Sequence, residues 1–308
     1  MRGVWITELE RPPELAALAE PNTGRIVEMA AVSLNPLDLS VAAGRFYGGH
    51  PELPYVPGCE GVGRTGDRLV YVFGGGLGVA RNGTLAERVV APDGAWFQLP
   101  DDADPALAAV CGIAGVAAWA PVTRVAEVAE GDRVLVLGAT GTVGLIAVQA
   151  AKLRGASWVV AAGRDPRRLD RARALGADAV AELGDDTAGS FARAFGNDGP
   201  TVVIDPLWGE AVAAASQVAA PGARIVQIGQ SAGAEATFDS AAVRGKQLRI
   251  FGHSNFALAP DDRRAIHLEL LAEVQAGRIT IDLERFPLER IAEAWDAQGS
   301  GTKAVVEL

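Results

Sequence analysis

The stretch RVLVLGATGTVG, residues 133–144, decides the fold of this chain. A continuous apolar run follows Arg133 and ends at Leu137, as expected for a strand buried on both faces of a parallel sheet. Gly138, Gly141 and Gly144 follow, and a helical pattern of apolar residues continues to Leu153. A glycine-rich loop between a buried strand and a helix is typical of a site for the phosphates of a dinucleotide.

The three glycines have different physical roles in such a loop. Gly138 permits a tight turn, Gly141 lets the backbone approach a pyrophosphate, and Gly144 allows the helix to pack closely on the sheet. The N-terminus of the helix adds N–H donors and the positive end of its dipole. The alternative is a structural junction without a ligand. We assign cofactor binding to the whole loop: Gly138, Ala139, Thr140, Gly141, Thr142, Val143 and Gly144.

Strand-like and helical segments alternate from this loop to about residue 254. Such alternation predicts a doubly wound parallel sheet with right-handed crossovers, which is an α/β fold of the Rossmann type. The further strands are expected at residues 158–161, 179–180, 201–204, 224–228 and 248–251, and the helices at 143–153, 166–175, around Phe191, and at 209–219.

The end of the second strand of this sheet indicates which dinucleotide binds. Sheets that bind NAD place an Asp or Glu there to accept a hydrogen bond from the ribose 2′-OH. Here Gly163 carries no carboxylate, and Arg164 offers a planar set of donors to a 2′-phosphate, with Arg168 in the next helix to assist. These residues predict NADPH. Asp165 leaves NADH open, because it could be the ribose acid placed one residue late.

The rest of the chain has a different character. Residues 1–118 consist of short strand-like segments separated by Gly and Pro, which predicts an irregular, mostly antiparallel β domain. The tail from residue 255 to 308 contains two helical patterns and a final strand. We therefore expect a dinucleotide-binding domain, residues 119–254, inserted into a substrate domain made of residues 1–118 and 255–308.

Composition excludes several classes of function. The 308 residues carry a formal net charge of −10 and no long run of Lys and Arg, which argues against binding to nucleic acid. No segment resembles a signal peptide or a membrane-spanning helix, so we expect a cytoplasmic protein with no membrane partner. Only two cysteines are present, so disulfide bonds are not expected to stabilise the fold.

Four short motifs carry a resemblance to a known family over nearly the whole chain. They are Asn-Pro-Leu-Asp at 35–38, Pro-Gly-Cys-Glu-Gly-Val-Gly at 57–63, Gly-Asp-Arg-Leu-Val at 66–70 and Leu-Gly-Ala-Asp at 175–178. In order and spacing the chain resembles the medium-chain dehydrogenase/reductase superfamily, and within it the zinc-free quinone oxidoreductase-like branch. The resemblance implies a GroES-like substrate domain around the Rossmann-type domain, with nicotinamide and substrate meeting between them.

The resemblance also bears on metal binding. Zinc-dependent members place a Cys where Asn35 stands, a His where Cys59 stands and a Cys where Cys111 stands. Two sulfur ligands could remain, but an amide is a poor third ligand. We expect no metal, with both cysteines acting as small buried apolar residues.

Without a metal, hydride addition to an enone, quinone or enoyl thioester suits the site better than alcohol oxidation, because nothing obvious lowers the pKa of an alcohol. Tyr47 lies in a segment, residues 44–49, that is similar to the Gly-x-Tyr segment of quinone oxidoreductases and enoyl thioester reductases. The resemblance makes Tyr47 the candidate proton donor, with a packing role and protonation by solvent as the alternative. Asn35 is expected to point its amide toward nicotinamide or substrate, or else to cap the turn at Pro36.

Further cofactor contacts are expected beyond the carboxyl ends of the last strands. His253 is a possible proton shuttle there, although a lone His is more often a packing residue. Lys303 is similar to a cofactor-proximal lysine of the family. The expected contacts are Gly229, Gln230 and Ser231 after the fifth strand, Phe251, Gly252 and His253 after the sixth, and Lys303.

The leading function is reduction of a quinone or an α,β-unsaturated carbonyl compound by NADPH without a metal. The alternatives are an enoyl thioester reductase and, in another class, a non-enzymatic NADPH-binding structural or sensor protein. The last sheet strand, residues 248–251, would leave an apolar edge exposed, so we expect a homodimer formed by pairing of that strand with its two-fold mate.

Overall fold

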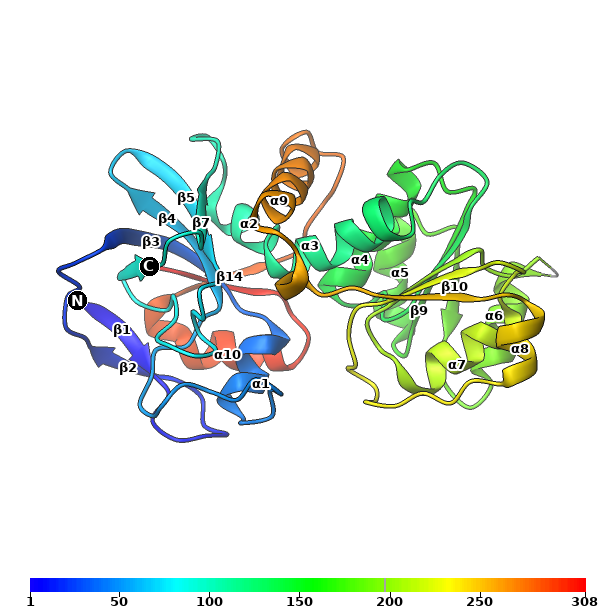
Figure 1. The fold of residues 1–308 in the computed structure, drawn as a ribbon, viewed down its shortest axis with the longest axis horizontal. Helices are drawn as coiled ribbons and strands as arrows, with labels where there is room; N and C mark the ends of the chain where they lie inside the picture. The colour runs from blue at the N-terminus through cyan, green and yellow to red at the C-terminus, as the bar shows by residue number, and fades with distance from the viewer. Residues whose placement is uncertain (197) are drawn as a thin grey trace. The chain divides into compact units, whose positions relative to one another are not determined.

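The computed structural model describes residues 1–196 and 198–308, which form two compact units. The first unit contains Met1–Ala114, Ala259–Gln275 and Ile281–Leu308, and the second contains Gly115–Leu258 and Ala276–Thr280. Both chain termini therefore belong to the first unit (Figure 1). No sequence pattern indicated that the short segment Ala276–Thr280 belongs to the second unit.

The second unit is built on a sheet of six parallel strands, which confirms the predicted Rossmann-type fold. Its spatial order is β10-β9-β8-β11-β12-β13. The order reverses between β8 and β11, and ligands of such sheets bind beyond the carboxyl ends of the strands at this switch point. The strands are β8 (Arg133–Val136), β9 (Trp158–Gly163), β10 (Ala179–Glu182), β11 (Val202–Asp205), β12 (Arg224–Gln227) and β13 (Arg249–Gly252).

Helices cover both faces of this sheet, with α4 and α5 along one face and α6 and α7 along the other (Figure 1). Because both faces are covered, the central positions of β8, β11 and β12 are apolar, and Leu135, Val203 and Ile225 are fully buried. The helices are α3 (Ile113–Ala120), which begins in the first unit, a π-helical turn (Pro121–Val125), α4 (Thr142–Leu153), α5 (Pro166–Ala174), α6 (Thr187–Phe195), α7 (Gly209–Val218) and α8 (Ser240–Gly245).

The first unit contains the predicted mostly antiparallel β domain. Its larger sheet runs in the order β14-β15-β3-β4-β5-β7, with β6 paired to β3, and only β14 and β15 pair in parallel. The strands are β3 (Arg25–Ser33), β4 (Glu60–Thr65), β5 (Arg68–Phe73), β6 (Arg88–Ala91), β7 (Trp96–Gln98), β14 (Glu284–Pro287) and β15 (Ala304–Glu307), with a separate hairpin of β1 (Arg2–Trp5) and β2 (Glu14–Ala17).

The sequence predicts only strands before residue 118, whereas the structure also forms helices there. Helix α1 (Pro36–Ala42) begins behind Asn35, and α2 (Pro105–Val110) begins behind Asp104, whose carboxylate accepts from two backbone N–H groups. A capping residue followed by Pro is a helix start signal that the strand-like pattern obscured.

The C-terminal part of the chain contains the remaining helices. They are short turns at Asn255–Ala257 and Leu288–Arg290, α9 (Pro260–Gln275) and α10 (Ile291–Gly299).

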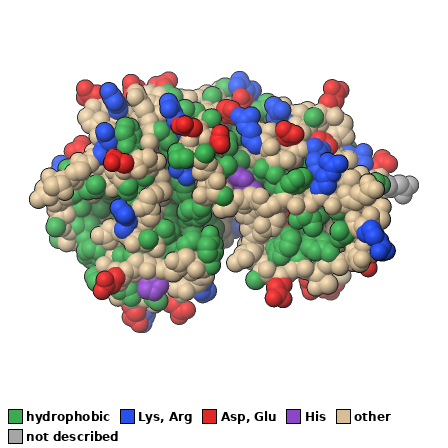
Figure 2. Space-filling view, viewed as in Figure 1, with side chains coloured by type: hydrophobic (Ala, Val, Ile, Leu, Met, Phe, Trp, Pro, Cys, Tyr) green, Lys and Arg blue, Asp and Glu red, His purple; other side chains and the backbone are tan. Residues whose placement is uncertain are grey.

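Two surface properties bear on partners. Among residues 1–196 and 198–308, no helix has the length and apolar character needed to cross a bilayer. On the face drawn in Figure 2, Lys and Arg side chains are scattered among Asp and Glu side chains.

Candidate functional site

The glycine-rich loop joins β8 to α4 at the switch point of the sheet. The backbone N–H of Ala139 donates to the carbonyl oxygen of Ala162 at 2.9 Å, which ties the loop to the end of β9. A Cβ atom on Gly144 would lie 2.5 Å from the Cα atom of Ala139, whereas one on Gly141 would lie no closer than 3.7 Å to Gly138. Gly144 is therefore required by packing, and the space beside Gly141 stays open for a ligand.

The start of α4 suits an anion. Gly141 is its N-cap residue and has no side chain with which to satisfy the first N–H groups of the helix. The first turn contains Thr142 and Val143, both half-buried. These unsatisfied N–H groups and the helix dipole fit the pyrophosphate of a dinucleotide.

The end of β9 brings together the residues expected to select the cofactor. Gly163 is the buried last residue of the strand, and Arg164 is exposed directly behind it. The carboxylate of Asp165 caps α5 by accepting from the N–H of Arg167 at 2.9 Å, and it lies 3.8 Å from the Nε atom of Arg168. Asp165 therefore has a local structural role at the start of this helix.

Asp205, at the end of β11, lies on the other side of the switch point and was not anticipated as a site residue. It is fully buried, and its Oδ1 atom accepts from the N–H groups of Leu207 and Trp208, at 2.9 Å each. Burial raises the pKa of this carboxyl to about 6. The sequence feature that could have identified Asp205 is its position as an acidic residue at the end of the apolar run of β11, directly before Pro206.

The segment after β12 lies against the same turn. A Cβ atom on Gly229 would lie 2.8 Å from the carbonyl oxygen of Pro206, and the hydroxyl of Ser231 donates to that oxygen at 3.1 Å. Gln230 and Ser231 are both exposed. The structure therefore brings residues 229–231 to the carboxyl edge of the sheet, beside the end of β11.

Phe251 and Gly252 are placed differently from expectation. They do not follow the sixth strand but form its last two positions, because the pairing of β13 with β12 extends to Gly252. His253 comes next and is half-buried, with its Nε2 atom 3.1 Å from the Oδ1 atom of Asn255. Burial lowers the pKa of this imidazole.

In the first unit, Asn35 stands at the centre of a buried polar network. Its amide nitrogen donates to the carbonyl oxygen of Ser33 at 3.0 Å and to Glu60 Oε1 at 2.7 Å, and its Oδ1 atom accepts from Lys303 at 2.8 Å. Only 1% of Asn35 is exposed. Its two amide hydrogens are thus both engaged within the unit. Asn35 occupies the N-cap position of α1, where its backbone N–H donates to Asp38 Oδ2 at 2.8 Å.

Glu60 is the acidic member of this network and is fully buried. It accepts from the Tyr71 hydroxyl at 2.6 Å and from the N–H of Ile113 at 2.6 Å, besides Asn35. Burial raises the pKa of Glu60, although the charge of Lys303 opposes the shift, and burial lowers the pKa of Lys303 to about 8. Sequence reasoning placed Glu60 only in a turn motif and missed this role.

Tyr47, the candidate proton donor, is 86% exposed. It follows α1 in a stretch where Gly44 and Gly49 both have positive φ, and its ring centroid lies 4.4 Å from that of Phe46. Phe46 packs against the core of the unit. The phenol ring of Tyr47 therefore contacts the Phe46 ring on one side and is otherwise exposed to solvent.

Comparisons with known proteins identify the family. The family model for zinc-binding dehydrogenase matches residues 142–273. The quinone oxidoreductase of Thermus thermophilus, solved also with NADPH, superposes over the full length of both chains with a TM-score of 0.79 and 29% identity. An NAD-dependent alcohol dehydrogenase does so with a TM-score of 0.85 and 27% identity. The chain belongs to the medium-chain dehydrogenase/reductase superfamily.

This confirms the resemblance to the superfamily that the sequence motifs carry. A curated relative, a phenolphthiocerol/phthiocerol polyketide synthase of Mycobacterium tuberculosis, is 31% identical over 294 residues. That match covers 89% of this chain but only 13% of the relative. The chain thus corresponds to a small part of the polyketide synthases it matches.

The donor set does not fit the zinc ion that the family description names. Asn35, at the first ligand position, is engaged by Glu60 and Lys303, and burial raises the thiol pKa of both Cys59 and Cys111. Within the part of the chain that the structure describes, no three His, Cys, Asp or Glu side chains gather as a metal site. We therefore derive no catalytic step through zinc.

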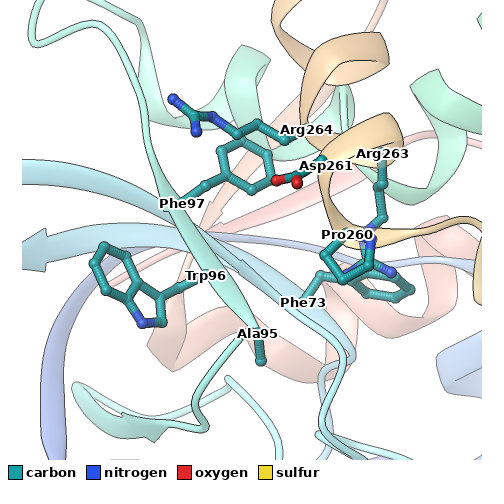
Figure 3. Close-up of a pocket in the computed structure, with 9 residues that line it drawn as sticks. Phe73, Ala95, Trp96, Phe97, Pro260, Asp261, Arg263 and Arg264 are labelled. Atoms are coloured by element: carbon teal, nitrogen blue, oxygen red, sulfur yellow. The ribbon is translucent and has the colours of Figure 1, made fainter.

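A cavity of about 160 Å³ lies within the first unit, and none of the predicted site residues lines it (Figure 3). Phe73 at the end of β5, Phe97 of β7 and the start of α9 form its walls. The guanidinium of Arg263 lies over the Phe73 ring, 4.7 Å from its centroid. The residues that line this cavity are not those assigned to the cofactor and the substrate.

Proposed function

We propose that this protein transfers hydride from NADPH to a quinone or an α,β-unsaturated carbonyl compound without a metal ion. The observation that carries the cofactor assignment is the end of β9, where Gly163 has no side chain, Arg164 is exposed and Asp165 is engaged as a helix cap. The Thermus thermophilus relative, a quinone oxidoreductase solved with NADPH, supports both the cofactor and the substrate class.

Several elements of the second unit would hold the dinucleotide. The first N–H groups of α4 would bind the pyrophosphate, while Arg164 and Arg168 would pair with the 2′-phosphate. We assign the nicotinamide end to residues 229–231 and 251–253, which stand at the carboxyl ends of β12 and β13. NADPH supplies the hydride.

The substrate then needs a proton and stabilisation of the negative charge on its oxygen. We propose that Tyr47 donates the proton, because its ring is exposed and its phenol is an acid of suitable type. We propose a positioning role for Asn35. Its amide is engaged by Ser33 and Glu60, and its backbone N–H donates to Asp38 at the start of α1, the helix that leads to the Tyr47 segment. Lys303 would act through Asn35 in the same way.

An enoyl thioester reductase is the second candidate, and the similarity to polyketide synthases favours it. Such a substrate would need cations to meet its phosphates. Arg244 is exposed on α8, but the amino group of Lys246 donates to carbonyl oxygens of Ser216 and Gln217 near the end of α7. A third candidate, a non-enzymatic NADPH-binding protein, would bind cofactor without turnover.

One assay separates these functions. Oxidation of NADPH is followed with a panel of benzoquinones, simple enones and crotonyl-CoA. Turnover of quinones or enones supports the proposal, a clear preference for crotonyl-CoA supports the thioester reductase, and NADPH binding without any turnover supports the non-enzymatic protein. Gly144→Val is the control, because its added atoms collide with the loop backbone and should abolish cofactor binding.

We expect Arg164→Ala to weaken NADPH binding by about tenfold or more and to leave NADH binding nearly unchanged, because a lost charge-assisted pair costs about 1.5–3 kcal/mol. Isothermal titration of both cofactors measures the effect. Arg173→Ala, which removes an exposed arginine from the far end of α5, is the matched control and should change neither affinity. Equal losses for NADPH and NADH would contradict the assignment.

We also expect a homodimer formed through β13. This strand is at the edge of the parallel sheet, where Ile250 is 44% exposed and Phe251 is 37% exposed. Soluble proteins avoid such open apolar edges, and pairing with a two-fold mate would cover it. Sedimentation at micromolar concentration should show a dimer, and Ile250→Lys should shift it toward monomer. A monomeric wild-type protein would refute the prediction.

A further inference from the structure

Gly163 is fixed in place by the sheet. It is buried and pairs with Glu182 of β10 in the parallel register. Its carbonyl oxygen also accepts from the N–H of Leu183 at 2.9 Å. The backbone at position 163 therefore cannot move away from a new side chain without loss of sheet hydrogen bonds.

Thr140 of the dinucleotide loop occupies the space that a side chain at position 163 would need. A Cβ atom built on Gly163 would lie 2.6 Å from Thr140 Cγ2, a distance at which one of the two groups must shift. The next nearest atoms are Leu169 Cδ2 at 3.3 Å and Thr140 Oγ1 at 3.5 Å. Removal of one methyl group would thus relieve the closest contact.

Thr140 cannot easily retreat. The backbone N–H of the neighbouring Ala139 is hydrogen-bonded to the carbonyl oxygen of Ala162 in β9 at 2.9 Å. Helix α4 packs tightly against the other side of the loop, since a Cβ atom on Gly144 would collide with Ala139. A β-branched side chain has few χ1 rotamers with which to avoid the clash. Leu169, by contrast, offers the flexible end of a longer side chain.

We propose that Thr140 is a cofactor-selecting residue, whose methyl group reserves position 163 for glycine and so excludes the carboxylate that would bind the ribose of NADH. The inference rests on the proposed binding of the dinucleotide at this loop. Selection then has two parts: Arg164 attracts the 2′-phosphate, and Thr140 keeps the competing acid out. The nearby Asp165 does not replace that acid, because it caps α5.

Three variants test this proposal: Gly163→Asp alone, the same change with Thr140→Ser, and the same change with Thr140→Val. Serine keeps the hydroxyl and removes the methyl group, while valine keeps the methyl group and removes the hydroxyl. Dissociation constants of NADPH and NADH are measured by titration, and the midpoint of thermal unfolding is measured without cofactor. The two double variants therefore differ in whether the clash persists.

Gly163→Asp alone should lower the unfolding midpoint and weaken both cofactors by about tenfold or more. Thr140→Ser should restore the midpoint and NADH binding while NADPH stays weak, and Thr140→Val should restore neither. The proposal is overturned if Gly163→Asp alone already binds NADH as well as the serine double variant, or if serine rescues no more than valine. If the wild-type protein shows no preference for NADPH over NADH, the proposed cofactor is wrong. That result is independent of the comparison between the two double variants, which tests the role of Thr140.

Discussion

Glu60→Ala should lower the free energy of unfolding by about 3–5 kcal/mol, because it removes one partner of a buried ionic network. The ammonium of Lys303 would remain buried after losing the larger of its two countercharges, with only that of Asp38 left. The Asn35 amide, the Tyr71 hydroxyl and the Ile113 N–H would lose their acceptor at the same time. Chemical denaturation followed by circular dichroism measures the loss.

Two comparisons make this result specific. Glu293 of α10 forms an exposed ion pair with Arg290. Glu293→Ala removes this carboxylate and should leave the unfolding transition unchanged. Glu60→Gln keeps the size of the side chain but removes its charge, so adding Lys303→Met to it should recover part of the lost stability. If Glu60→Ala unfolds at the same denaturant concentration as the wild type, the network does not stabilise the unit.

Tyr47→Phe should reduce turnover of an enone or enoyl thioester by about 10²-fold, within the range for loss of one general acid. The ring and its contact with Phe46 remain, so only the hydroxyl is tested. NADPH affinity should not change, because the assigned dinucleotide loop and the Arg164 segment belong to the second unit and Tyr47 to the first. Steady-state kinetics with each substrate class provides the measurement.

The contrast between substrates is the decisive part of that experiment. Quinone reduction should fall less than enone reduction, because the reduced oxygens of a quinone can take protons directly from water. Phe46→Leu, which changes the neighbouring ring and keeps the phenol, is the control for disturbed packing. If Tyr47→Phe leaves every active substrate unaffected, the tyrosine is not the donor, and protonation must come from solvent or from a group such as His253.

Local sequence patterns were sufficient for the parallel sheet of the second unit, but not for α8 or for the segment Ala276–Thr280 that joins this unit. The apolar run before Gly138, the glycine spacing and the alternation of strands and helices predict the parallel sheet that the structure forms. Each of these signals involves residues close together in the chain, where backbone preference and burial periodicity act directly. The family motifs added the β-rich first unit, although the start signals of α1 and α2 were hidden among strand-like segments.

The chemistry of the buried side chains was decided by the tertiary structure alone. Asn35 meets Glu60 across 25 positions and Lys303 across 268 positions, because β3, β4 and β15 lie in one sheet. Thr140 meets Gly163 because the loop is bonded to the end of β9. The sequence by itself determined which elements form and where a dinucleotide loop stands. Which polar groups become buried partners depended on strand register and close packing, since these bring together residues that no local pattern relates.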